Sequence, residues 1–450
     1  MKTKKRVLIT VASLGLFFIA FQISGSSTSR FLNNAAFPAK IRETTREESK
    51  LISEQIFTDL PESPIVCDRT SIRYDLCSIN GPTVLDSATS TFFTMNSTGP
   101  PLMEIIRPYP RKFEDLIMAH IKNLTLTVGP RIPSCRVQHD APALVFTAGG
   151  YTGNFWHDFN DGFVPLFITA NTIFPDQDFV IVVSEAPKWW PSKYADLLRT
   201  FTNHPIINLG SDTTTHCFPS AKIGLISHGF MIINQTMIPN SKTYLNFRGL
   251  LSKAFSQQAQ VQIITPKLTK PRPLLVLASR RHATGRSIMN QAQVIRLIKK
   301  VGFDVVVFEP KTKTPLQESY ALLNSSHAFV GVHGAALTHS LFLRPGAVFV
   351  QVVPIGIGWA AEAFFGRVAM GLNLEYFEYK IEVEESTLKD KYGKDSLLVR
   401  DPFALLKTGW PPEVMDIYLK EQNVKLDLVR FKRYLKKTFK KATRFMENNG

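Results

Sequence analysis

The hydrophobic pattern is clearest between residues 273 and 354, where short, almost wholly apolar runs alternate with amphipathic stretches. The apolar runs predict strands at 273–279, 303–308, 328–332 and 348–353, and the amphipathic stretches predict helices at 291–301 and 316–324. Nearly continuous Val, Leu and Ile runs joined by helices indicate parallel strands that are covered on both faces. We therefore expect a doubly wound lobe here, and ligands bind such sheets outside the carboxyl ends of their strands.

Residues 63–245 repeat the alternation with shorter elements. Apolar runs predict strands at 143–148, 179–183, 206–209 and 222–233, and residues 194–201 predict an amphipathic helix. A Lys- and Gln-rich segment at 237–272 indicates a hinge, so that the second lobe covers 246–410 and a basic helical tail covers 411–450. The predicted fold is α/β, with two Rossmann-like lobes and a cleft between them.

An uncharged apolar run at residues 7–23 follows a basic segment at 1–6. Its length approaches the ~20 residues that span a bilayer, and the positive charges ahead of it predict a cytosolic N-terminus. Residues 1–6 would then be a cytosolic tail, 7–23 a single-pass type II anchor and 24–62 a polar stem before a lumenal body. A cleaved signal peptide is the alternative, because small residues follow the apolar run.

The formal net charge of +16 narrows the classes of partner, because the excess of Lys and Arg gathers at the two ends of the chain. Neither cluster has the pattern of an element that reads a nucleic acid groove, so we expect no nucleic acid partner. The C-terminal cluster interleaves apolar residues at helical spacing, which favours a surface helix with a solvated basic face. An acidic polysaccharide or lipid headgroups are the alternative partners of that face.

All four cysteines lie beyond residue 62, and an even number permits complete pairing in a secretory compartment. Of the three possible pairings we favour Cys67–Cys77 together with Cys135–Cys217. The N-glycosylation sequons begin at Asn96, Asn123, Asn234 and Asn324. We expect Asn324 to remain unmodified, because a buried strand follows it.

A glycine-rich turn, Gly331-Val-His-Gly-Ala-Ala336, joins the strand predicted at 328–332 to a helix. Backbone N–H groups at a helix N-terminus bind phosphate, and glycine lets the backbone approach closely. The candidate ligands of a nucleotide diphosphate are therefore His333, Gly334 and Ala335. Guanidinium groups pair bidentately with phosphate oxygens, and three lie after the strand predicted at 273–279: Arg280, Arg281 and Arg286. Solvated surface arginines, and a histidine that only caps the turn, are the alternatives.

A second motif, Gly-Asn-Phe-Trp-His-Asp-Phe-Asn-Asp at 153–161, follows the strand predicted at 143–148. If Asn154 begins a helix, His157 and Asp161 lie on one face. A carboxylate beside an imidazole is a competent general base, and a stabilising pair without chemistry is the alternative. Asp176 and Asp178 match a metal-binding Asp-x-Asp pattern, but they precede a strand and so lie away from the ligand edge. We therefore predict no metal site.

These motifs, with Leu-Glu-Tyr-Phe-Glu-Tyr at 374–379 and Glu-Glu-Ser at 384–386, resemble those of plant glycosyltransferase family 61 over residues 67–410. The resemblance is greatest to the branch of xylan arabinosyltransferases and xylan β-1,2-xylosyltransferases. It implies a Golgi type II membrane enzyme of GT-B fold that inverts the anomeric carbon, with a UDP-pentose as donor and β-1,4-xylan as acceptor. Asp158 departs from the family pattern, so a catalytic role for it is in doubt.

The expected mechanism is a single displacement at the anomeric carbon. Asp161 takes the proton of the acceptor hydroxyl, and His157 orients that hydroxyl or exchanges roles with Asp161. The arginines, His333 and the N–H groups after Gly334 stabilise the leaving diphosphate without a metal or other cofactor. Candidate sugar-stacking aromatics are Trp156, Trp359 and Tyr376. Transfer to protein or N-glycan acceptors, and a non-catalytic protein that binds xylan or scaffolds a synthase complex, are alternative functions; an oxidoreductase is disfavoured, because the Gly-x-Gly-x-x-Gly fingerprint is missing.

Overall fold

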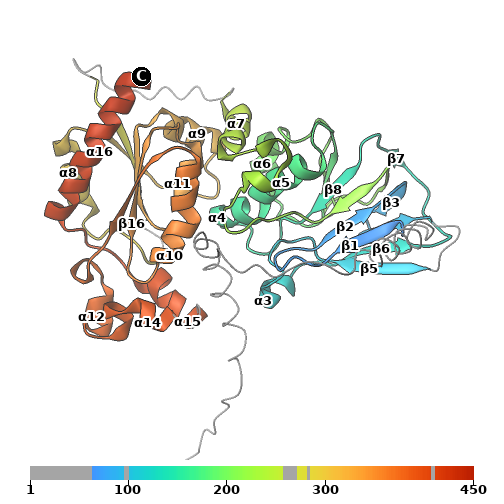
Figure 1. Ribbon diagram of the computed structural model, residues 1–450, viewed down its shortest axis with the longest axis horizontal. Coiled ribbons are helices and arrows are strands. Elements are labelled where there is room, and N and C mark those ends of the chain that lie inside the picture. Colours follow the sequence, from blue (N-terminus) through green and yellow to red (C-terminus); the bar gives the residue numbers. More distant parts are fainter. Residues whose placement is uncertain (1–62, 96–100, 257–270, 281–283, 407–410, 450) are drawn as a thin grey trace, which may run out of the picture.

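The computed structural model describes residues 63–95, 101–256, 271–280, 284–406 and 411–449 as two α/β halves that lie side by side (Figure 1). The predicted anchor and stem, the sequon at Asn96 and the candidate ligand Arg281 lie outside the described residues. In the described ranges, no helix has both the length and the apolar character that a membrane crossing requires.

The C-terminal half contains one five-stranded sheet whose strands are all parallel. Across the sheet the strands are β14 (Asp304–Phe308), β13 (Leu274–Ala278), β15 (Ala328–Val332), β16 (Val348–Val353) and β17 (Glu375–Lys380). The first four occupy the predicted strands. Three of them, β13, β15 and β16, are buried on both faces, whereas β14 lies at the edge of the sheet and is only partly buried. The parallel sheet predicted for this half is therefore confirmed.

Helices cover both faces of this sheet. Alternate residues such as Leu275 and Val330 face α8 (Gln291–Val301) and α16 (Leu428–Asn449). Their neighbours Val276 and Phe329 face α9 (Leu316–Ser325), the 3₁₀ segment η4 (Ala335–Phe342) and α11 (Arg367–Gly371). The remaining segments of this half are α10 (Gly358–Ala361), η5 (Glu362–Gly366), η6 (Val383–Glu385), α12 (Leu388–Tyr392), α13 (Leu397–Arg400), α14 (Pro402–Leu406), α15 (Pro412–Asp416) and η7 (Ile417–Glu421).

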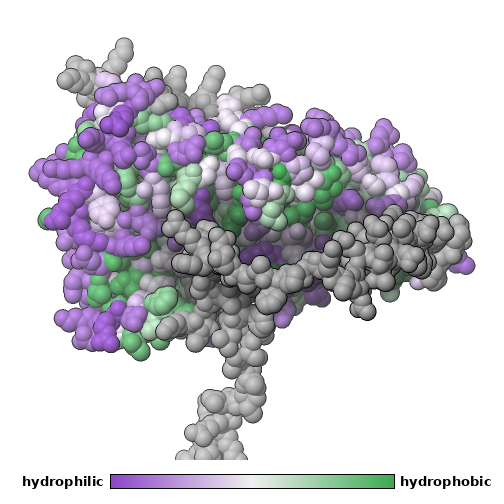
Figure 2. Space-filling model, viewed as in Figure 1, coloured by the Kyte–Doolittle hydropathy of each residue, from purple (hydrophilic) through white to green (hydrophobic). Residues whose placement is uncertain are grey.

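The basic C-terminal segment folds as the long helix α16, which packs its apolar face against the sheet. Phe431, Leu435 and Ala442 are buried in the core, whereas Arg433, Lys436 and other basic residues are exposed. Hydrophilic residues accordingly dominate this end of the molecule in the space-filling view (Figure 2). The helix thus belongs to the covering layer of the C-terminal half and presents a basic outer face.

The N-terminal half contains two six-stranded sheets, which differs from the single Rossmann-like layer that we predicted. The first sheet has the order β1 (Ile65–Asp68), β2 (Leu76–Ile79), β12 (Ala221–Ile223), β8 (Ala143–Phe146), β9 (Val180–Val183) and β10 (Ile207–Asn208), and its last four strands are parallel. The second has the order β5 (Leu102–Ile106), β6 (Leu124–Val128), β4 (Thr91–Thr94), β3 (Thr83–Asp86), β11 (Thr215–Phe218) and β7 (Val137–Gln138). The long strand predicted at 222–233 is confined to β12.

The first sheet lies between a helical layer and the second sheet. Leu144 and Phe146 face the helices, whereas Ala143 and Val145 pack with residues of the second sheet such as Leu126. The helical segments are α3 (Asp115–Met118), α4 (Phe155–His157), η1 (Asp158–Phe163), α5 (Val164–Ile173), α6 (Trp190–Leu198), η2 (Gln235–Met237), η3 (Pro239–Ser241) and α7 (Tyr244–Phe255). The second sheet takes the place of a second helical layer, and the links from β3 to β4 and from β4 to β5 are too short for a covering helix.

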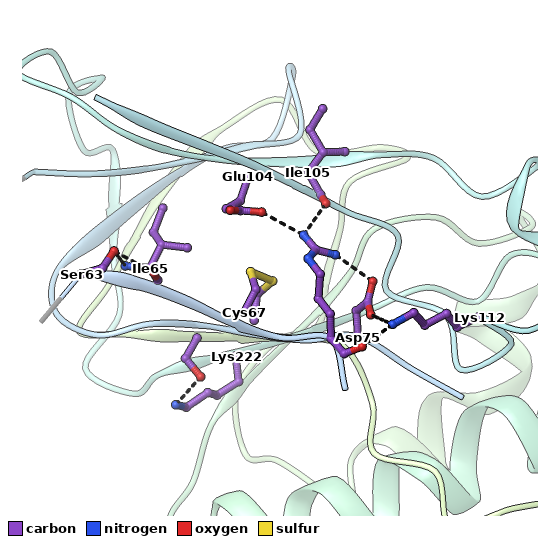
Figure 3. The surroundings of a disulfide bond; sticks show 11 residues. Ser63, Ile65, Cys67, Asp75, Glu104, Ile105, Lys112 and Lys222 are labelled. Carbon is purple, nitrogen blue, oxygen red and sulfur yellow. Dashed lines mark hydrogen bonds and ion pairs between the residues drawn. A yellow bond between two sulfur atoms is a disulfide. The ribbon is translucent and has the colours of Figure 1, made fainter. Parts of the chain in front are cut away.

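Both disulfides that we favoured, Cys67–Cys77 and Cys135–Cys217, are confirmed. Cys67 and Cys77 are directly opposite each other on β1 and β2. Beside this bridge the guanidinium of Arg69 pairs with Asp75 and with Glu104 of β5, which links the two sheets (Figure 3).

Helix α7 lies within the segment that we predicted as a hinge, and it packs against both halves. Its Phe247 ring contacts Phe167 of α5, with centroids 5.3 Å apart. On its other side, Arg248 donates to the carbonyl oxygen of Leu343 at 2.6 Å and to the Asn324 side chain at 2.7 Å. One apolar core therefore runs from the N-terminal half through α7 into the C-terminal half.

Candidate active site

The first candidate group lies on the helix that leaves β8. Asn154 caps this helix as predicted, because its side chain accepts a hydrogen bond from Trp156 N at 3.1 Å. After α4 the backbone widens into the π-helical segment η1, a geometry that is frequent at functional sites. His157 Nδ1 and Asp161 Oδ2 are 2.7 Å apart, so the predicted pairing of these two side chains is confirmed.

Asp161 is 2% exposed and accepts hydrogen bonds from four groups. Arg111 Nε lies 2.8 Å from Oδ1, and Asn160 Nδ2 donates to the same oxygen. Tyr109 Oη donates to Oδ2 at 2.9 Å, beside the imidazole of His157. Burial by itself would raise the pKa of Asp161, but the charge of Arg111 and the hydrogen bond from His157 outweigh it and lower that pKa. The carboxylate is therefore held ionised and saturated with donors.

The contacts of His157 decide which of its ring nitrogens is free. Arg111 Nη2 lies 3.1 Å from Nδ1, but Asp161 Oδ2 is closer, at 2.7 Å. The shorter contact assigns the proton to Nδ1, which leaves the lone pair on Nε2. Among the described residues Nε2 has no hydrogen-bond partner, and the ring stacks on Tyr151 with centroids 4.3 Å apart. This arrangement suits His157 as a base and Asp161 as the group that orients it.

Tyr109 and Arg111 are functional residues that the sequence analysis missed. Both follow β5 in the segment Arg-Pro-Tyr-Pro-Arg at 107–111 and lie some fifty residues before Asp161. Arg111 is 5% exposed and also pairs with Glu114 at 2.5 Å. Gly150 has a φ of +59°, and a Cβ there would lie 2.7 Å from the Tyr109 ring, so this loop needs glycine. A Pro-rich loop carries no local signal of such a role.

Two other aspartates of the N-terminal half, Asp158 and Asp178, form hydrogen bonds that join segments of the fold. Asp158 accepts from Gly153 N at 3.0 Å and from Tyr194 Oη at 2.6 Å, which fastens the glycine-rich loop to α6. Asp178 lies just before β9 and accepts from Asn203 Nδ2 at 2.9 Å. Both therefore serve the fold, in agreement with their place in the sequence.

The second candidate group lies at the carboxyl ends of β13 and β15. Gly334 has a φ of +153°, and a Cβ there would lie 2.9 Å from Arg280 Nη1 and 3.2 Å from Arg286 Nη1. Both guanidinium groups therefore meet the backbone of the glycine-rich turn. Neither forms an ion pair with any carboxylate of the described residues, and burial followed by the like charge of Arg280 lowers the pKa of Arg286. Two half-buried cations without a counter-charge are an anion-binding arrangement.

His333 lies beside these arginines and is neutral. Gln351 Nε2 lies 2.9 Å from His333 Nδ1, and the Tyr376 hydroxyl donates to Gln351 Oε1 at 2.8 Å. Burial, then the charges of Arg286 and Arg280, lower the pKa of His333 to about 3. Its Nδ1 therefore accepts, and its Nε2–H remains as a neutral donor. Ala335 begins η4, whose first N–H groups lack partners within the helical turn.

Aromatic contacts join the two groups across the interface between the halves. The Trp156 ring lies 4.3 Å from that of Phe364, and Phe364 lies 6.1 Å from the ring of His333. In a second contact between the halves, the Phe155 ring stacks on the His339 ring, with centroids 4.2 Å apart. The Trp156 ring also lies 4.8 Å from that of His157, so these contacts link the His157 pair to the anion-binding arrangement through the interface between the halves.

A cavity of about 320 Å³ opens at this interface. Gly153, Phe155 and Lys193 line it from the N-terminal half. The C-terminal half contributes the ends of β13 and β14 and the start of η4, namely Ser279, Arg280, Glu309, Ala335 and His339. Its volume is in the range of small-molecule sites, which begins at about 300 Å³.

The three candidate stacking residues differ in exposure. Trp359 is 41% exposed and its ring lies 6.1 Å from that of Phe230 beside the interface. Trp156 is 6% exposed and packs in the interface, and Tyr376 is engaged with Gln351. Trp359 is therefore the most exposed of the three.

Comparison with known proteins gives a consistent result. A family model described as Glycosyltransferase 61 matches residues 155–350, which span both candidate groups. Xylan glycosyltransferase MUCI21 of Arabidopsis thaliana is 37% identical over 90% of this chain and 85% of that protein. Two proteins of Oryza sativa subsp. japonica are also similar: alpha-1,3-arabinosyltransferase XAT3, at 32% identity over 82% of this chain and 63% of that protein, and beta-1,2-xylosyltransferase XYXT1, at 31% over 85% and 86%.

Among solved structures, the iron-containing dodecameric glycosyltransferase TibC of enterotoxigenic E. coli has a TM-score of 0.27 and 13% identity over 65% of this chain and 80% of that chain. This likeness is too weak to add to the assignment. The sequence relatives suffice, since they are similar over nearly the whole chain: the protein belongs to glycosyltransferase family 61.

Proposed function

We propose that this glycosyltransferase moves a pentose from UDP-xylose or UDP-arabinofuranose onto O2 or O3 of a β-1,4-xylan backbone, with inversion at the anomeric carbon. The observation that carries the proposal is that a histidine–carboxylate pair and an unpaired cluster of cations face one interface from opposite halves. The first can activate a hydroxyl, and the second can hold a departing diphosphate. The named activities of the relatives supply the acceptor and the pentose.

In the proposed reaction His157, rather than Asp161, takes the proton of the acceptor hydroxyl. Its Nε2 carries the free lone pair, whereas both oxygens of Asp161 are occupied by donors and its pKa is lowered. The hydroxyl oxygen forms its bond to the anomeric carbon while the bond to the diphosphate oxygen breaks. Asp161 fixes the tautomer of His157 and stabilises the imidazolium that forms, which is the exchange of roles that the sequence left open as an alternative.

The leaving UDP gathers negative charge as the bond breaks. Arg280, Arg286 and the neutral Nε2–H of His333 lie where they can stabilise that charge, and Arg281 remains a predicted ligand. We propose that these cations and dipoles act without a metal ion, so that a chelator leaves the rate unchanged. The expected cost of removing one such donor is about 10²-fold in turnover.

The proposed setting is the Golgi lumen, with a type II anchor at residues 7–23 and a GT-B arrangement of the two halves. The expected anchor and stem precede the α/β body along the chain, and four sequons and two disulfides fit a secretory compartment. Fractionation of tagged protein with Golgi markers, together with protease protection of the C-terminus in sealed vesicles, tests the location and the orientation.

The decisive experiment incubates purified protein with xylohexaose and a panel of UDP-sugars, followed by measurement of product mass and linkage. The proposal expects transfer of one pentose and release of UDP only when donor and acceptor are both present, apart from slow hydrolysis. Transfer of N-acetylhexosamine to a protein or N-glycan would replace xylan as the acceptor. Binding of xylan without turnover of any donor would instead favour a scaffold.

A further inference from the structure

We propose that Lys193 reaches across the interface and contacts the diphosphate of the donor nucleotide, opposite Arg280. This inference rests on the proposed use of a UDP-sugar and assigns to the N-terminal half a part in donor binding. The residues singled out from the sequence for the diphosphate all lie in the C-terminal half, so Lys193 is an addition to that set.

The position of α6 brings Lys193 to the interface. Asp196 lies one turn further along α6, and its Oδ2 accepts a hydrogen bond from Gln317 Nε2 of α9 at 2.5 Å. This contact fastens α6 of the N-terminal half to α9 of the C-terminal half. Lys193 lines the 320 Å³ cavity together with Arg280, Glu309 and His339.

Three aromatic rings surround the ammonium group of Lys193. Its Nζ lies 5.4 Å from the centroid of Phe155, 5.3 Å from Trp189 and 5.4 Å from Tyr194. Within the described residues no carboxylate oxygen lies within ion-pair distance of this Nζ. Burial lowers the pKa of Lys193, and the charge of Asp158 offsets this only in part. An anion in the cavity would supply the missing counter-charge.

The other walls of the cavity indicate where a diphosphate fits. Arg280 lies beside Gly334, so the Lys193 and Arg280 sides together present two cations, and Lys311 adds a third at the wall formed by residues 310–316. Glu309 is the carboxylate among the lining residues, and it accepts a hydrogen bond from Ser279. His339 adds no charge, because burial lowers its pKa to about 3. The space between Lys193 and Arg280 therefore suits phosphate oxygens, and the segment at 310–316 remains for the nucleoside.

A phosphate contact makes a specific prediction about nucleotides. Charge-assisted hydrogen bonds to phosphate favour UDP, whereas uridine lacks the group that Lys193 would bind. Replacement of Lys193 should therefore weaken UDP by about 10- to 100-fold and leave uridine unchanged. A purely structural role in packing α6 would weaken both ligands equally.

The test measures the affinity of the full-length protein for UDP and for uridine by calorimetry. Lys193→Met should lose UDP affinity selectively, and Lys193→Arg should restore most of it because the charge returns. Lys188→Met is the matched control, since Lys188 is exposed, lies just ahead of α6 and does not line the cavity. UDP binding by Lys193→Met that equals the wild type, or equal losses for UDP and uridine, overturns the inference. Failure of the wild type to bind UDP overturns the proposed donor as well, so the two failures are distinguishable.

Discussion

Replacement of Asp161 by asparagine should trap His157 in the wrong tautomer. The amide nitrogen must take the place of one oxygen, and at Oδ1 it would face Arg111 Nε and Asn160 Nδ2, which only donate. At Oδ2 it faces the Tyr109 hydroxyl, which can accept, and His157 Nδ1. The side chain therefore settles with its nitrogen toward His157. Nδ1 must then accept, the proton moves to Nε2, and the base is lost.

The magnitude follows from these contacts. A carboxylate-to-amide exchange that traps the wrong imidazole tautomer lowers turnover by about 10⁴-fold in a serine protease, and we expect about 10³- to 10⁴-fold here. The substitution also leaves the buried Arg111 with Glu114 as its remaining ion-pair partner, at 2.5 Å. Loss of one member of a buried pair costs about 3 kcal/mol of unfolding free energy at the low end of the usual range.

The assay combines kcat for pentose transfer with UDP affinity and a thermal unfolding curve. UDP affinity should be unchanged, because Asp161 contacts neither Lys193 nor the anion-binding cluster of the C-terminal half. Unchanged affinity would also show that the variant is folded. Tyr109→Phe is the matched comparison: it removes one hydrogen bond to Asp161 at 2.9 Å but keeps the tautomer, so kcat should fall only about 10-fold. An Asp161→Asn enzyme that is folded and keeps more than about a tenth of wild-type kcat would refute the assignment of His157 as the base.

Two further predictions concern the C-terminal half. Gly334→Ala places a Cβ 2.9 Å from Arg280 Nη1 at a φ of +153°, so the donor KM should rise at least about 10-fold while the acceptor KM stays constant in initial-rate measurements. Burial lowers the folded-state pKa of His333 and His339 to about 3 and of His327 to about 4. Below about pH 6.5 these histidines bind protons in the unfolded chain but stay neutral in the folded protein. Their contribution to the free energy of unfolding is therefore fully present above about pH 6.5 and is lost as the pH falls toward those values. The unfolding temperature should therefore be lower at pH 5 than at pH 7.5, and replacement of His339 by glutamine should reduce that difference; equal sensitivity in the variant would contradict this origin.

Local patterns were enough for four of the five strands of the C-terminal sheet, all but β17, and for the pairing of His157 with Asp161. The strands β15 and β16 are almost wholly apolar because both of their faces are covered, so the sequence marks them without knowledge of their neighbours. Asn154 signals the start of α4, and helical spacing then brings the two side chains together. The glycine-rich turn was likewise recognisable, because it follows a buried strand; the structure adds that Arg280 and Arg286 approach the backbone at Gly334.

Tertiary structure decided what each of these groups can do. Tyr109 and Arg111 belong to a loop that precedes β8 in the sequence, whereas Asp161 follows β8. Their hydrogen bonds to Asp161 in the folded protein make that carboxylate an orienting group instead of a base. Lys193 lines the same cavity as Arg280 only because α6 docks on α9. Helical and strand periodicity arise from neighbours along the chain, whereas proton position and charge balance depend on groups that folding brings together from distant segments.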